Sequence, residues 1–167
     1  MARQRTTTTR GRDEPAVAVR LEPVAPGNRS AVLALELAAD QQDQLDSNAE
    51  SLAEARYDRD ARPRAVVAGD RVVGFLMYDA SENGEALLYR FMIDRRHQGQ
   101  GYGRAALEAL VREVAALGHV RAIVVSYMPD NEPARRFYRG FGFVEDGEDE
   151  DGEVMARLTL AAGAPAK

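Results

Sequence analysis

The sequence predicts an α/β protein in which a mixed, mostly antiparallel sheet is flanked by about four helices. First, segments of alternating character separated by tight turns predict consecutive antiparallel strands at 64–68, 71–78 and 85–93. Second, apolar residues recur at helical spacing over 104–117. Third, the almost continuously apolar segment 121–126 is typical of a strand that is buried on both faces. Strand, loop, helix and strand therefore form one crossover.

The N-terminal third is expected to contain one strand and two short helices. Alternating apolar and polar residues indicate a strand at 16–21, which ends at a segment rich in proline and glycine. A first short helix is expected over 32–37, because polar capping residues precede these apolar positions. The Ser-x-x-Glu sequence at 47–50 is a capping box, so a second helix is expected from there to about Tyr57.

The C-terminal third is expected to contain a helix and a hairpin. Asp130 or Asn131 can cap the helix, with Pro133 in its first turn and glycines at its end. Its apolar face consists of Ala134, Phe137, Tyr138 and Phe141. A last hairpin is expected from 143–145 and 154–160, joined by an acidic loop.

The length of 167 residues fits one domain, which we expect over 16–161. Residues 1–15 have little apolar surface to bury, so we expect a disordered tail there, with a nucleic-acid-binding arm as the alternative. Residues 162–167 are expected to form a loose C-terminus. The sequence has no run of about 18 apolar residues, so we expect a cytoplasmic protein without a membrane partner.

Composition excludes several classes of chemistry. The 22 basic and 27 acidic residues give a net charge of −5, which argues against nucleic-acid binding and is compatible with a cationic substrate. The chain has no cysteine and only two histidines, so no disulfide, thiolate nucleophile or metal site is expected. The only lysine is Lys167, which argues against Schiff-base chemistry and against a P-loop.

The segment between the strand at 85–93 and the long helix carries the strongest chemical signal. Gly99, Gly101 and Gly103 alternate there, so successive backbone N–H groups can point at one anion at the N-terminus of the helix. This pattern favours a phosphate-binding loop, and a tight turn without a ligand is the alternative. A Gly-x-Gly-x-x-Ala pattern at 101–106 also matches a dinucleotide-binding motif. However, three antiparallel strands precede it, and the next strand ends at Val125-Ser126 without an acidic residue that could hold a ribose.

The loop also contains an Arg-x-x-Gly-x-Gly pattern at 96–101, and Asn-x-x-Ala-x-x-Phe-Tyr-x-x-Phe-Gly-Phe follows at 131–143. Together with the element order, these motifs make 17–160 resemble the GNAT superfamily of N-acetyltransferases. The resemblance implies a GNAT-type acyl-CoA N-acyltransferase fold, acetyl-CoA as the donor and a small-molecule amine as the acceptor.

Within that superfamily the chain is similar to bacterial spermine/spermidine (diamine) N-acetyltransferases. The closer resemblance rests on 47–55, 91–103, 126–134 and 152–154. It implies that the acceptor is a polyamine.

The resemblance also implies which residues contact acetyl-CoA. The backbone N–H groups of 98–103 would hold the pyrophosphate, and the main chain of Phe91 and Ile93 would bind the pantetheine arm. Tyr138 would protonate the departing CoA thiolate, and a core aromatic is the alternative role for this residue. The full implied set is Phe91, Met92, Ile93, Arg96, His97, Gln98, Gly99, Gln100, Gly101, Tyr102, Gly103, Arg104, Asn131, Arg135 and Tyr138.

The acceptor nitrogen must be neutral to attack a thioester, so the site needs a carboxylate or a water chain that takes up its proton. The resemblance places the N-terminal helices beside the acceptor, and their acidic residues are Glu36, Asp40, Glu50 and Glu54. Each could instead bind a distal ammonium or lie on a solvated helix face. Residues 145–153 hold seven carboxylates without a counter-charge among them, which indicates a solvated loop or a site that attracts polycations.

Three functions follow as hypotheses. The leading one is acetyl transfer from acetyl-CoA to a primary amine, with a polyamine as the acceptor. The second is the same transfer to an aminoglycoside-like antibiotic, an amino acid, or a protein N-terminus or lysine. The third is an acetyl-CoA sensor without turnover. Dimerisation is common in the superfamily, so a homodimer is one of the oligomeric states that the resemblance allows.

Overall fold

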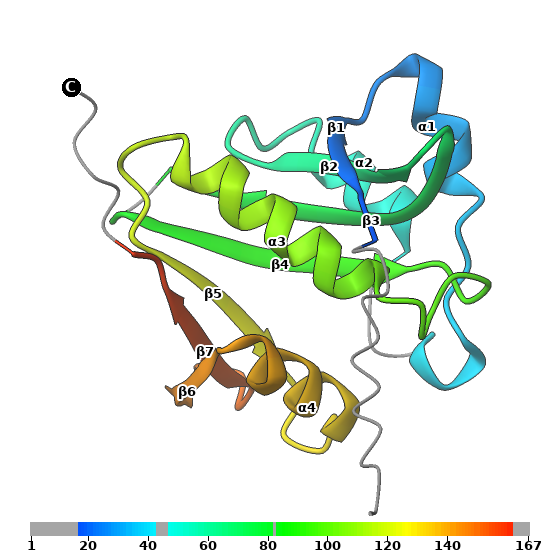
Figure 1. Cartoon of the computed structure of the whole chain (residues 1–167). Helices are drawn as coiled ribbons and strands as arrows, with labels where there is room; N and C mark the ends of the chain where they lie inside the picture. Colours follow the sequence, from blue (N-terminus) through cyan, green and yellow to red (C-terminus); the bar gives the residue numbers. More distant parts are fainter. Residues whose placement is uncertain (1–16, 43–46, 82, 162–167) are drawn as a thin grey trace, which may run out of the picture.

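The computed structural model describes residues 17–42, 47–81 and 83–161, and the predicted tails at 1–15 and 162–167 lie outside these ranges. Seven strands in the described residues form one mixed sheet in the order β1-β2-β3-β4-β5-β7-β6 (Figure 1). All neighbours pair antiparallel except β4 and β5, which are parallel. The strands are β1 (Arg20–Pro23), β2 (Arg62–Ala68), β3 (Arg71–Asp79), β4 (Glu85–Ile93), β5 (Ala122–Tyr127), β6 (Val144–Glu148) and β7 (Val154–Thr159).

Helices cover both faces of this sheet. They are α1 (Pro26–Leu33), a 3₁₀ helix (Ala39–Gln41), α2 (Asn48–Glu54), α3 (Tyr102–Ala115) and α4 (Glu132–Phe141). Figure 1 shows α3 across one face and α4 beside β5 and β7, whereas α1 and α2 lie against the opposite face. The mixed, mostly antiparallel sheet and its helices confirm the predicted fold class.

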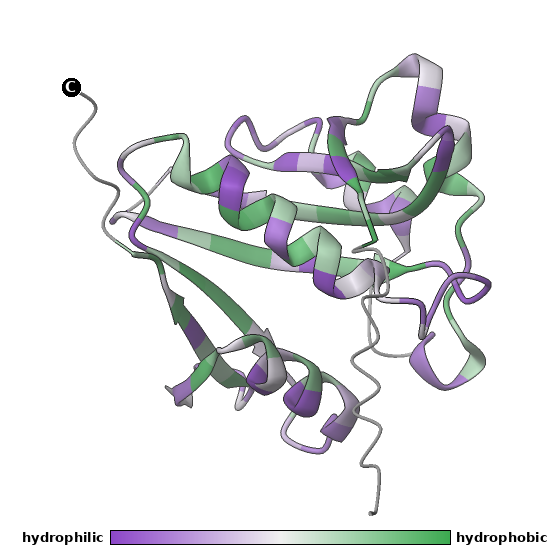
Figure 2. Ribbon diagram, in the orientation of Figure 1, coloured by the Kyte–Doolittle hydropathy of each residue, from purple (hydrophilic) through white to green (hydrophobic). Residues whose placement is uncertain are grey.

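Two separate cores follow from this arrangement. The core on the α3 side includes Val66, Leu76, Leu107, Leu110 and Ile123, and the core on the α1 and α2 side includes Val32, Leu52, Val67, Phe75 and Met77. Figure 2 shows the hydrophobic strands between these layers and the hydrophilic residues that recur along α3. No helix in the described parts of the chain is long and apolar enough to cross a membrane.

The sheet opens between β4 and β5. These strands pair only through Glu85 with Ala122, Ala86 with Ile123 and Leu87 with Val124, and they diverge beyond that point (Figure 1). On its other edge β4 contains a β-bulge, since Met77 pairs with Arg90 and Tyr78 pairs with Leu88. The extra residue is Tyr89, and its ring packs in the core on the α1 and α2 side.

Two N-terminal predictions were wrong in position. The first strand begins at Arg20 rather than at 16, and residues 17–19 are not in a strand. The first helix is α1, which ends at Leu33, so most of the predicted helix at 32–37 is irregular. The helix begins early because Pro26 occupies its first turn and the Asn28 side chain accepts a hydrogen bond from the Ala25 N–H at 2.8 Å.

Other boundaries shifted by a few residues. The helix with the capping box ends at Glu54 rather than near Tyr57, and α3 begins at Tyr102 rather than at Arg104. The predicted cap at Asn131 is confirmed, because its side chain accepts a hydrogen bond from the Ala134 N–H at 3.2 Å.

The acidic segment after α4 is partly a strand rather than a loop. β6 covers Val144–Glu148 and pairs with β7. Asp146 accepts a hydrogen bond from Arg157 Nε at 3.1 Å, and Arg157 also pairs with Glu85. Acidic residues at the start of this segment therefore have counter-charges from other elements. The sequence of the segment alone does not contain these counter-charges.

Candidate active site

The separation of β4 and β5 creates a cleft of about 920 Å³. The Asp94 N–H donates to Val73 O at 2.9 Å, so the backbone groups of Asp94 point toward β3. Because these directions alternate along an antiparallel strand, the N–H and C=O groups of Phe91 and Ile93 point away from β3, into the opening. In agreement, Gln98 Nε2 donates to Ile93 O at 3.0 Å. The edge of β4 thus offers main-chain hydrogen bonds to an extended ligand.

The glycine-rich loop closes one end of this cleft. Gly99 and Gly101 have φ angles of 71° and 86°, in the left-handed region that favours glycine. Gly101 is the N-cap of α3 and has no side chain that could cap the first N–H groups of the helix. These groups and the helix dipole face the loop, as an anion-binding site requires.

A close approach between helices explains the third glycine. A Cβ atom at Gly103 would lie 3.2 Å from Phe137 Cζ, tighter than ordinary packing. Gly103 therefore allows α3 and α4 to meet beside the cleft, which both helices line.

Asp94 anchors the start of the loop. Its side chain is 0% exposed and accepts hydrogen bonds from the Arg96 side chain, from the Arg96 N–H at 2.9 Å and from the Glu36 N–H at 3.0 Å. These bonds, led by the Arg96 guanidinium, hold the pKa of Asp94 well below its ordinary value. Arg96 is thus oriented toward Asp94, and its predicted contact with a cofactor stays a prediction.

Tyr138 lies in an aromatic cluster on the wall of the cleft. Its ring stacks almost parallel on Tyr127 of β5, with 5.8 Å between centroids, and meets Phe137 and Phe143 edge-on at 5.3 Å. Burial, with a smaller contribution from Tyr127, raises the pKa of Tyr138. The phenol therefore remains protonated at neutral pH.

Arg135 is held by one carboxylate of α4 and one of β6. Its Nε donates to Glu145 Oε1 at 2.8 Å, and its Nη1 lies 3.4 Å from Glu132 Oε2. Glu145 also accepts a hydrogen bond from the Tyr127 hydroxyl at 3.2 Å. The Arg135 hydrogen bond, followed by that of Tyr127, lowers the pKa of Glu145. Arg135 does not line the cleft.

Most of the predicted cofactor residues line one cleft. They are Phe91, Met92, Ile93, His97, Gln98, Gly99, Gly101, Gly103, Arg104, Asn131 and Tyr138. The predicted residues outside the lining are Arg96, Gln100, Tyr102 and Arg135. These predicted residues come from β4, the glycine loop, α3 and α4, and the full lining extends from Leu37 to Glu153.

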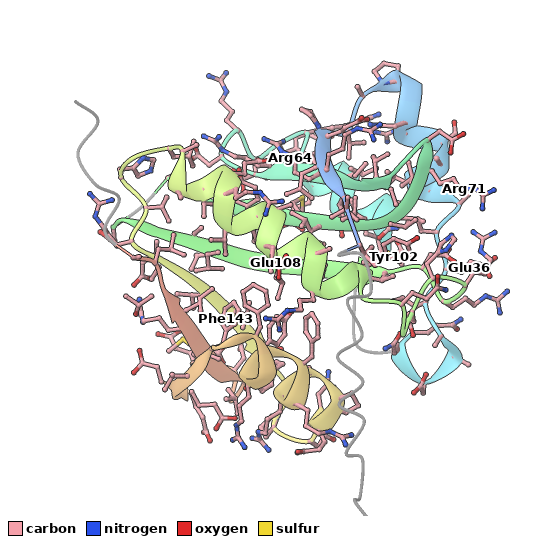
Figure 3. The ribbon with its side chains drawn as sticks, viewed as in Figure 1. Glu36, Arg64, Arg71, Tyr102, Glu108 and Phe143 are labelled. Atoms are coloured by element: carbon pink, nitrogen blue, oxygen red, sulfur yellow. The ribbon has the colours of Figure 1, made fainter. Side chains whose placement is uncertain are left out.

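The four acidic residues predicted on the acceptor side do not line the cleft. Glu36 forms an ion pair with Arg95 at 2.6 Å and lies beside the loop, well away from β7 (Figure 3). Glu50 caps α2 through Ser47, and Glu54 lies 3.4 Å from Arg90. Asp40 lies in the 3₁₀ helix.

The lining residues that were not predicted as site residues include Glu153 and Tyr89, although Glu153 belongs to the acidic run 145–153 for which a polycation-attracting site was one interpretation. Glu153, directly before β7, is the only carboxylate in the lining formed by the described residues. Tyr89 lies at the bulge of β4, and its buried hydroxyl has no hydrogen-bond partner among the described residues. Burial, together with the charges of Asp58 and Glu54, raises the pKa of Tyr89 to about 12. Both positions depend on how β4, β5 and β7 meet, which no local pattern reports.

Comparison with known proteins identifies the family. The model of the acetyltransferase (GNAT) family matches residues 30–143. This chain belongs to the GNAT acetyltransferase family. It is 32% identical over 147 residues to the spermine/spermidine N(1)-acetyltransferase of Bacillus subtilis, covering 83% of this chain and 97% of that protein.

Solved structures of this GNAT protein's relatives have the same fold. The ribosomal-protein-S18-alanine N-acetyltransferase of Escherichia coli superposes with a TM-score of 0.67 at 18% identity, covering 88% of this chain and 97% of that one. The PaiA N-acetyltransferase of Thermoplasma acidophilum, solved with coenzyme A, gives 0.66 at 11% identity and covers 85% and 99%. The protein is a GNAT-family acetyltransferase, and the donor of this family is acetyl-CoA.

The residues of the cleft fit acetyl-CoA. The uncapped N-terminus of α3 and the glycine loop suit a pyrophosphate, because they offer N–H groups without side chains in front of them. The free edge of β4 suits the amide groups of a pantetheine arm, which bind main-chain donors and acceptors as a strand does.

Proposed function

We propose that this acetyltransferase transfers the acetyl group to a primary amine of a polyamine such as spermidine or spermine. The observation that supports the acceptor class is the 32% identity to a spermine/spermidine acetyltransferase over 97% of that relative's length. The net charge of −5 favours approach of a polycation over approach of an anion.

Binding of the donor is assigned to the backbone. The N–H groups of 98–103 hold the phosphates, and the N–H and C=O groups of Phe91 and Ile93 hold the pantetheine arm. Acetyl-CoA supplies an acetyl group that is activated as a thioester. Main-chain N–H groups of β4 near the bulge polarise the carbonyl of that thioester, because the opening of the sheet leaves them without a strand partner.

Tyr138 acts as the general acid. The neutral amine nitrogen forms the new C–N bond and gives up a proton to water, the C–S bond breaks, and the Tyr138 hydroxyl donates its proton to the departing thiolate sulfur. Water then returns a proton to the phenolate, which restores the general acid. In water a free thiol has a pKa of about 8.5, which is lower than the pKa of a phenol. Proton transfer from the phenol to the thiolate is therefore unfavourable in water. Burial raises the pKa of a thiol as well as that of a phenol, so a shared apolar site narrows the difference.

The test is release of CoA, followed with a thiol reagent. The panel of acceptors is spermidine, spermine, putrescine, lysine, an aminoglycoside and a short peptide. The absence of cysteine from the chain keeps the background low. We expect saturable turnover of spermidine or spermine, with KM at or below about 1 mM. Turnover of another panel member without turnover of any polyamine would contradict the proposed acceptor and would identify a different one.

A further inference from the structure

Glu153 lines the cleft directly before the start of β7, beside the end of β5. Val154 pairs with Tyr127, and both are buried in the core on the α3 side. Since successive side chains near a strand point to opposite faces, Glu153 is directed away from that core. Its N–H donates to Asp149 Oδ1 at 2.9 Å and its C=O accepts from the Asp149 N–H at 2.9 Å. The backbone of Glu153 is thus fixed before any substrate arrives.

The Glu153 carboxylate differs in its environment from the other acidic candidates. Glu36 and Glu54 form ion pairs with arginines, Glu50 is bonded to Ser47, and neither these residues nor Asp40 lines the cleft. In the described parts of the chain, the side chain of Glu153 makes no hydrogen bond or ion pair, although the cleft is lined by Arg90 and Arg104. Arg104 lies 3.3 Å from Glu108. Glu153 therefore presents a half-buried negative charge to the cleft.

The chemistry of the acceptor decides what this charge can bind. The reacting nitrogen has to be neutral, and a neutral amine cannot form an ion pair. A polyamine keeps at least one further ammonium when one of its nitrogens has lost its proton. A carboxylate in the lining of the cleft, on a backbone that is already fixed, can hold that charged nitrogen while the neutral one reaches the thioester.

We propose that Glu153 is a specificity-determining residue that binds a non-reacting ammonium group of the acceptor. This inference rests on the proposed polyamine acetyltransferase activity, and it adds a residue that selects acceptors with a second positive charge. Amines without a second charge would not use this contact.

The test compares Glu153→Gln with Glu150→Gln in the full-length protein. Glu150 lies in the same turn, is exposed and does not line the cleft, so its substitution changes the net charge equally. With saturating acetyl-CoA, we expect kcat/KM for spermidine to fall roughly 10- to 100-fold in Glu153→Gln, the loss of one hydrogen bond between charged groups. The fall should be mainly in KM. Butylamine, which has one nitrogen, should be affected less than about threefold.

A binding measurement and a charge-preserving variant complete the experiment. Calorimetric titration of spermidine into the protein saturated with CoA gives the Kd. This Kd should rise in Glu153→Gln by about the same factor as the KM for spermidine. Glu153→Asp should retain part of the affinity, and an unchanged KM for acetyl-CoA shows that each variant is folded.

Three results would overturn the inference. Equal kinetics of Glu153→Gln and Glu150→Gln on spermidine would remove Glu153 from the acceptor site while leaving the polyamine activity in place. Equal losses on spermidine and butylamine would show that Glu153 acts on the reacting nitrogen instead. A wild-type protein that acetylates another amine but no polyamine would overturn the proposed function, and with it the role of Glu153.

Discussion

Replacement of Asp94 by Asn tests how the glycine loop is held in place. One carboxylate oxygen accepts hydrogen bonds from the N–H and Nε of Arg96, and the other accepts from Arg96 Nη2 and the Glu36 N–H. In Asp94→Asn the amide oxygen can keep the first pair, but the amide NH₂ faces two donors. An unsatisfied buried group costs about 1–3 kcal/mol. The Arg96 side chain is exposed and can turn to water, which limits the cost. We therefore expect the free energy of unfolding to fall by about 2–4 kcal/mol.

Urea unfolding and thermal melting at pH 7 measure this loss. For a domain of this size, about 1 kcal/mol corresponds to about 2–4 °C in Tm, so the midpoint should fall by roughly 5–15 °C. The control is Glu36→Gln, which removes a solvent-exposed ion pair with Arg95 and should change stability by less than about 1 kcal/mol. A midpoint of Asp94→Asn equal to that of the control would refute this account of the loop.

The pH dependence provides a second check on Asp94. Its pKa is lower in the folded protein than in the unfolded chain, so its carboxylate stabilises the fold above the unfolded value of about 3.9. That contribution is lost as the pH falls toward the folded value. The stability difference between wild type and Asp94→Asn should therefore be constant from about pH 5 to 8 and shrink below about pH 4. A difference that stays constant down to pH 2.5 would mean that the charge of Asp94 is not involved.

Three further substitutions test the cleft. Tyr138→Phe should lower kcat by about 100-fold or more with little change in the KM for acetyl-CoA, and an unchanged kcat would eliminate the phenol as the general acid. Gly101→Ala should raise the KM for acetyl-CoA and lower stability by about 1–2 kcal/mol, because alanine is strained at a φ of 86°; wild-type values for both would contradict this. Tyr89→Phe should not destabilise the protein and should raise its urea midpoint slightly, since the buried hydroxyl has no partner among the described residues. A clear loss of stability would show that this hydroxyl is paired.

Local patterns predicted those elements whose stability is local. The apolar spacing of α3, the cap at Asn131 and the turn at Gly69 are each complete within a few residues. Residues 34–38 have apolar side chains at similar spacing, yet their backbone is fixed from elsewhere. Glu36 donates its N–H to Asp94 and accepts the Arg95 N–H at 2.8 Å, across 58 positions of sequence. A helix there would give up these bonds, and no pattern within the segment indicates them.

The glycine loop and the acidic residues show the same contrast at the site. The loop could be predicted because left-handed backbone and accessible N–H groups require glycine at particular positions within a few residues. The role of a carboxylate depends on which arginine lies next to it in space, and arginines supply 21 of the 22 basic residues of this chain. Glu54 meets Arg90 across 36 positions, whereas Glu153 meets none in the described residues. That distinction exists only in the folded chain.

The aromatic residues of α4 link the opening of the sheet to its chemistry. Once β4 and β5 separate, they lose the hydrogen bonds that would hold them together, and side chains of α4 connect them instead. Phe137 packs against Phe91 of β4, with 5.9 Å between centroids, and Tyr138 stacks on Tyr127 of β5. Tyr138 therefore helps to connect the two sides of the cleft and also lies on its wall.

These two roles of Tyr138 can be separated by substitution. Tyr138→Phe keeps the ring, so its Tm should stay close to that of the wild type while kcat falls. Tyr138→Ala removes the ring as well and should destabilise the protein by about 3–5 kcal/mol. Its KM for acetyl-CoA should then rise, because β5 loses its contact with α4. If Tyr138→Ala melted at the same temperature as Tyr138→Phe, the ring would not connect α4 to β5, and the opening would be fixed by the β-bulge and the β5–β7 pairing alone.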